Sequence, residues 1–73
     1  MGMDIDMVPM KINDMIRLLE SNGFALIRSG HHRVYAHGAI KVVLSHGRIV
    51  SPGVVRGALR SIEQAKNREK VYA

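Results

Sequence analysis

The stretch Ser29-Gly30-His31-His32-Arg33-Val34-Tyr35-Ala36-His37-Gly38 lies near the middle of the chain and indicates its fold. Turn residues mark both of its ends, and residues 32–36 between them have the composition of a β-strand. Similar runs precede it at residues 24–28 and follow it at residues 39–44. Because connections this short join antiparallel neighbours, we expect a three-stranded antiparallel meander.

Helical patterns flank the predicted sheet on both sides. From residue 11 apolar residues recur at spacings of three, four and seven, and Asn22-Gly23 ends this pattern just before Phe24. Ser51-Pro52 supplies the N-cap and first position of a second helix, whose apolar positions repeat over residues 55–65. The order α-β-β-β-α predicts an α+β fold with both helices on one face of the sheet.

The chain has 73 residues, which is enough for one small domain and one core. We expect a flexible N-terminal extension at residues 1–9, a single domain at 10–68 and a frayed tail at 69–73. Apolar residues make up 47% of the chain, which excludes a disordered polypeptide. There are no cysteines, so neither disulfides nor a thiolate zinc site can reinforce the core.

The charge balance points to a polyanionic partner. The formal net charge is +5, and two of the six acidic residues lie in the first nine residues, which carry no base. The remainder of the chain is therefore more basic than the total suggests, as in proteins that bind nucleic acid. No apolar run is long enough for a transmembrane helix, and the N-terminus does not resemble a signal peptide, so we expect a cytoplasmic protein without membrane contact.

Three of the four histidines fall within the central stretch. An unperturbed imidazole has a pKa of about 6.5, so it can exchange a proton near neutral pH. RNA cleavage needs a base that takes the 2′-hydroxyl proton and an acid that protonates the leaving oxygen. Since strand alternation sends neighbouring side chains to opposite faces, His31 and His32 would not both reach a ligand unless a bulge at Gly30 breaks the pattern.

Basic residues around the histidines could hold phosphate groups and offset the charge that builds up on them. The candidates for RNA binding are Arg33, Lys41, Arg48, Arg56 and Arg60. A metal site is disfavoured, because there is no cysteine and the spacing of His31 and His37 does not suit zinc on a strand. We therefore expect neither a metal nor a cofactor.

Other readings of the same residues stay open. The histidines could be ordinary polar residues on a strand. The chain could also be a non-catalytic module that recognises duplex RNA by its shape. A third reading is an interaction protein whose basic face docks onto an acidic partner.

Several segments, taken in order, resemble the HicA toxin family, also called YcfA-like proteins. Met10-Lys11 and Leu18-Leu19-Glu20-Ser21-Asn22-Gly23-Phe24 resemble its opening helix, and Gly30-His31-His32-Arg33-Val34-Tyr35 resembles its histidine signature. Leu44-Ser45-His46-Gly47 resembles its apolar-Pro-x-His segment, without the family's usual proline before the histidine. Residues 52–62 resemble its closing helix. The resemblance covers residues 10 to about 65.

The resemblance implies a double-stranded-RNA-binding-like fold and a metal-independent mRNA interferase, the toxin of a type II toxin-antitoxin system. In the family one histidine of the signature is catalytic. Alignment on the aromatic residue and the following histidine gives that role to His32, with His31 in reserve because it stands where the family usually has serine. The implied partners are mRNA and a HicB-like antitoxin that covers the histidine face.

Overall fold

A computed structural model of the chain describes residues 8–72, with side chains described from Val8 to Arg68. Most of the predicted N-terminal extension therefore lies outside the described residues, and so does Ala73. The predicted domain limits and the frayed tail at 69–73 stay predictions.

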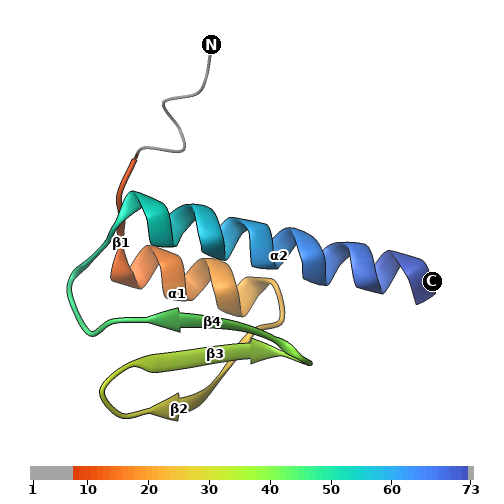
Figure 1. Ribbon diagram of the computed structural model, residues 1–73, viewed down its shortest axis with the longest axis horizontal. Coiled ribbons are helices and arrows are strands. Elements are labelled where there is room, and N and C mark those ends of the chain that lie inside the picture. The colour runs from red at the N-terminus through yellow and green to blue at the C-terminus, as the bar shows by residue number, and fades with distance from the viewer. Residues whose placement is uncertain (1–7, 73) are drawn as a thin grey trace.

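The three-stranded meander is the centre of the fold (Figure 1). Its strands β2, β3 and β4 pair antiparallel in chain order, and both helices lie on the same side of the sheet. This arrangement confirms the predicted α+β fold. The elements in order are β1 (Met10–Lys11), α1 (Ile12–Ser21), β2 (Ala25–Ser29), β3 (Arg33–His37), β4 (Ile40–Leu44), β5 (Ile49–Val50) and α2 (Pro52–Tyr72).

One face of β3 and β4 packs against the helices and forms the core, whereas all five residues of β2 are exposed. Tyr35 of β3 is 3% exposed and pairs with Val42 of β4, and Leu44 lies on the same face. The helices contribute Met15, Leu19, Val55, Ala58, Ile62 and Ala65 to this core. Because side chains alternate along a strand, Val34 and its partner Val43 point to the opposite face. We call that opposite face the open face, since no helix covers it in Figure 1.

A second, two-stranded sheet was not predicted. Met10 pairs with Val50 and Lys11 with Ile49, and the Ile12 amide donates a hydrogen bond of 2.8 Å to the Arg48 carbonyl. These strands have two residues each, which is too short for any periodicity in the sequence to show. The ladder ties the start of α1 to the segment that leads into α2.

Helix α1 ends as predicted, with Gly23 in the left-handed region at φ 85°. The Gly23 amide donates to Glu20 (3.1 Å), and the Phe24 amide donates to Leu19 (3.0 Å). This is the hydrogen-bond pattern of a Schellman motif. Phe24, the residue just before β2, is buried in the core.

Gly23→Ala is predicted to destabilise the protein more than Gly38→Ala. Both glycines have positive φ, which costs a residue with a β carbon about 1–2 kcal/mol. Only at Gly23 would the new β carbon also collide, 2.8 Å from Cδ2 of His37, whereas Gly38 has open space. Chemical unfolding of both variants measures the difference. Equal losses of unfolding free energy would show that the His37 contact is not rigid.

Candidate functional site

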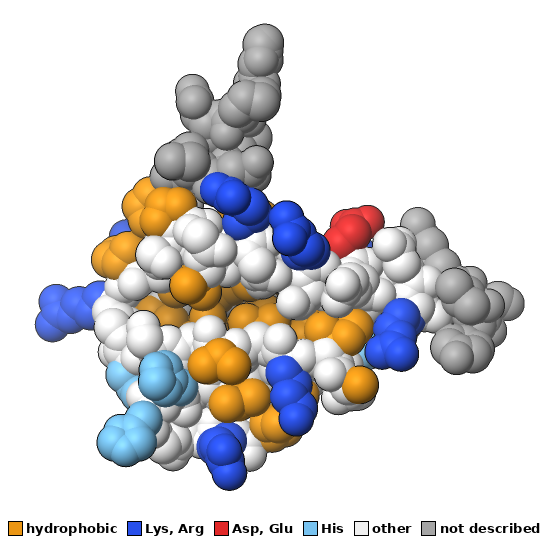
Figure 2. Space-filling view, in the orientation of Figure 1, with side chains coloured by type: hydrophobic (Ala, Val, Ile, Leu, Met, Phe, Trp, Pro, Cys, Tyr) orange, Lys and Arg blue, Asp and Glu red, His pale blue; other side chains and the backbone are white. Residues whose placement is uncertain are grey.

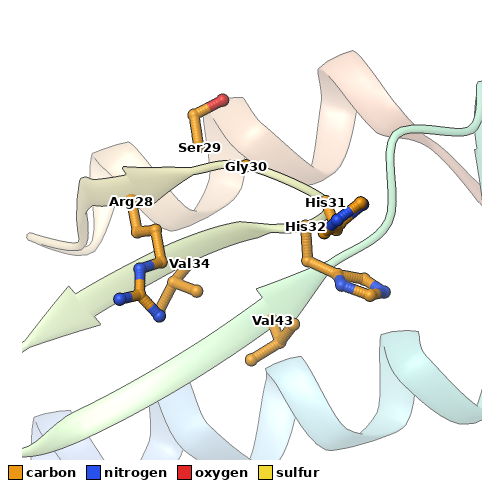
Figure 3. Close-up of a pocket in the computed structure, with 7 residues that line it drawn as sticks. All are labelled: Arg28, Ser29, Gly30, His31, His32, Val34 and Val43. Atoms are coloured by element: carbon orange, nitrogen blue, oxygen red, sulfur yellow. The ribbon is translucent and has the colours of Figure 1, made fainter.

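Both histidines of the adjacent pair line an open hollow on the exposed side of the sheet (Figure 3). The hollow has a volume of about 550 Å³ and lies where β2 turns into β3. Its lining residues are Arg28, Ser29, Gly30, His31, His32, Val34 and Val43, and we call it the histidine hollow.

The turn between β2 and β3 explains why both histidines reach the hollow. The last pair of the ladder is Ser29 with Arg33, so residues 30–32 lie outside the strands. The Gly30 amide donates to the His32 carbonyl at 3.1 Å and closes this turn. Strand alternation therefore does not separate His31 from His32. The irregularity in the ladder lies between Leu26 and Arg28, not at Gly30.

A third histidine contacts the same turn, although it follows the last strand of the meander in sequence. His46 lies in the loop after β4, and its Nε2 is 2.8 Å from the Gly30 carbonyl oxygen. Histidine side chains gather at one corner of the molecule in Figure 2. His37 lies at the far end of β3, where its ring packs against Phe24 with 5.5 Å between centroids.

Positive and apolar side chains extend the site along the open face. Arg28 also lines an adjoining hollow of about 510 Å³, together with Ile27, Val34, Lys41 and Val43. Ile27 and Val43 are 57% and 53% exposed, so apolar surface faces solvent here. Figure 2 shows hydrophobic patches between Lys and Arg side chains over the strands. None of the residues that line the two hollows is acidic, so the surface favours an anionic ligand with apolar parts.

The predicted RNA-binding residues are only partly brought together. Lys41 lines the adjoining hollow. Arg33 alternates with Val34 on β3 and so lies on the other face, paired with Leu44. Arg48 lines a separate hollow beside the start of α1, together with Lys11. Arg56 and Arg60 lie on α2, and neither lines the histidine hollow or the adjoining hollow.

Arg28 was not predicted as a site residue, although it lines both hollows on the open face. It stands two positions before Gly30, at the end of a predicted strand. Because the ladder shifts register between Leu26 and Arg28, simple alternation along β2 does not show which face Arg28 occupies. The tertiary structure was needed to place it.

The described part of the chain contains no group of three His, Asp or Glu side chains that could hold a metal ion. In the same residues, no helix has the length and apolarity to cross a membrane. The two hollows are lined by imidazoles, cations and apolar side chains, with Ser29 and Gly30 at the turn.

These features define a small basic α+β domain with a histidine site on the open face of its sheet. The family model described as HicA toxin of bacterial toxin-antitoxin matches residues 12–66, which is more than half of the chain. The chain therefore belongs to the HicA toxin family. No curated protein and no solved structure matches it.

His31→Ala and His32→Ala are each predicted to leave the unfolding free energy within about 0.5 kcal/mol of the original, because both side chains are exposed. His37→Ala is the matched comparison, since that ring is half-buried against Phe24 and Gly23. We expect it to cost about 1 kcal/mol or more. Thermal and urea unfolding test this, and a large loss for His32→Ala would mean that His32 supports the fold.

Proposed function

We propose that this toxin is a metal-independent mRNA interferase, an endoribonuclease in which His32 acts as general acid/base. The observation that carries the proposal is the exposed imidazole of His32 in a hollow that Arg28 also lines. Membership of the HicA toxin family supports the same activity. The expected setting is the cytoplasm, where mRNA is the substrate.

The chemistry requires one proton to be removed and one to be supplied. The 2′-oxygen loses its proton and attacks the adjacent phosphorus, the bond from phosphorus to the 5′-oxygen breaks, and the departing oxygen takes up a proton. The products are a 2′,3′-cyclic phosphate and a free 5′-hydroxyl. One well-placed imidazole contributes about 10²–10⁴-fold to such a reaction. Solvent can exchange the other proton, because the hollow is open to water.

His32 is the preferred candidate of the two adjacent histidines. It lies two residues before Val34, which faces the open side of β3 opposite Val43. Because His32 itself lies in the turn, its preference over His31 rests on its alignment with the catalytic histidine of the HicA signature. His31 lines the same hollow and stays the reserve candidate.

Arg28 and Lys41 are proposed to hold phosphates on the open face, with Val34 and Val43 beneath the sugars and bases. Cations that neutralise phosphates release counterions, so binding of this kind is salt-dependent and largely independent of sequence. The other predicted RNA-binding residues, Arg33, Arg48, Arg56 and Arg60, lie outside these hollows. Their contribution is proposed to be general attraction of the polyanion to a basic domain.

The proposed antitoxin is a HicB-like protein that covers the histidine hollow and the exposed Ile27 and Val43. An acidic surface on that partner would complement the net charge of +5. Covering the open face would exclude RNA and bury apolar surface in the same step.

His32→Ala is predicted to lower cleavage of a long single-stranded RNA by 10²–10⁴-fold or roughly to background, and to abolish growth arrest on expression. Cleavage by the unmodified protein is expected to persist in EDTA. Gel analysis of the products measures both effects. His31→Ala is run beside it, and a larger loss in that variant would transfer the role to His31.

Two outcomes would contradict this function. RNA binding with no cleavage by the unmodified protein would support the alternative of a non-catalytic RNA-binding module. Cleavage that EDTA abolishes would point to a metal-dependent reaction.

Arg28→Gln and Lys41→Gln are each predicted to weaken RNA binding and to reduce the slope of log K against log salt by about one. Lys66→Gln removes one charge from α2 at an exposed residue that lines neither hollow, and is the charge-matched control. Fluorescence anisotropy at several salt concentrations provides the measurement. A slope change as large in Lys66→Gln would show that net charge alone governs binding.

A further inference from the structure

We infer that His46 is a positioning residue, whose hydrogen bond to the Gly30 carbonyl holds the turn that carries His31 and His32. The effect on catalysis rests on the proposed function. The anchoring of the turn rests on the contact itself, in which Nε2 of His46 lies 2.8 Å from the Gly30 oxygen.

The turn has few hydrogen bonds of its own. Residues 30–32 lie beyond the last ladder pair, and the bond from the Gly30 amide to the His32 carbonyl is the backbone bond that closes them. The Gly30 carbonyl accepts a hydrogen bond from Nε2 of His46. Both polar groups of Gly30 are thus engaged, immediately before the two histidines. The bond from His46 connects this turn to another part of the fold.

The loop that carries His46 is held at both ends. It begins at Leu44, a core residue at the end of β4, and it runs into β5, which pairs with β1. The Arg48 carbonyl also accepts a hydrogen bond from the Ile12 amide at the start of α1. Through the hydrogen bond of His46, the turn is therefore attached to a segment that α1 and the core hold in place.

The geometry determines which replacement can take over from His46. A carbonyl oxygen only accepts, so Nε2 of His46 must carry the donated proton, which it does in the imidazolium and in one neutral tautomer. A glutamine side chain can place an N–H near the position of Nε2. An asparagine side chain is shorter and places its N–H near the position of Nδ1. Glutamine should therefore restore the bond, and asparagine should not.

Cleavage kinetics of the full chain test the catalytic consequence. We expect His46→Ala and His46→Asn to lower kcat about tenfold with KM changed less than about twofold, since small displacements of a reacting group are costly. His46→Gln should recover kcat to within about threefold of the original protein and keep its pH profile. Ser45→Ala, a change at the neighbouring exposed residue of the same loop, is the control.

Two kinetic results would overturn the inference. If His46→Gln were as inactive as His46→Ala, His46 would itself transfer the proton. If His46→Ala kept the original kcat, the bond would not position the turn for catalysis.

NMR of the same variants tests the structural part without any cleavage. In His46→Ala and His46→Asn the amide signals of residues 30–32 should shift and their exchange with solvent should accelerate, whereas His46→Gln should resemble the original protein. Unchanged turn amides in His46→Ala would refute the anchoring role. If these amides respond as expected but the unmodified protein does not cleave RNA, the proposed function fails and the anchoring role stands.

Discussion

The structure depends on the burial by two helices of one face of β3 and β4, the two strands of the meander that supply core residues. Tyr35, Val42 and Leu44 supply that face, and burial of apolar side chains is the main favourable term in the folding of a small domain. Strand alternation then forces Val34 and Val43 to the opposite side. The same constraint that makes the core thus creates the open face, on which His32, Arg28 and Lys41 can meet a large ligand.

Much of this architecture could be predicted from local patterns. The helix end at Gly23 and the helix start at Pro52 follow from glycine and proline chemistry, and both were predicted where the structure has them. The two short strands β1 and β5 could not be predicted, because a pair of residues carries no period. Their pairing is decided by tertiary contacts between distant parts of the chain.

The chemistry of the candidate site was easier to predict than the particular residues that line it. The sequence singled out the adjacent histidines beside the Gly30 turn, and both line the hollow, although strand alternation predicted that only one of them would reach it without a bulge at Gly30. Arg28 was missed because the register shift in β2 hides its face, and Arg33 was chosen for its nearness in sequence although it lies on the other face of β3. The contact between His46 and Gly30 joins two loops that are 16 residues apart, which no spacing rule predicts.

We propose that RNA lies across the open face beside His32. NMR titration of the unmodified protein with a single-stranded 2′-O-methyl RNA tests this directly, because that RNA lacks the attacking hydroxyl and stays intact. We predict that the largest amide shifts fall on Arg28, on the turn at residues 30–32 and on Val43. Shifts confined to the outer side of α2 around Arg56 and Arg60, with the sheet unchanged, would contradict it.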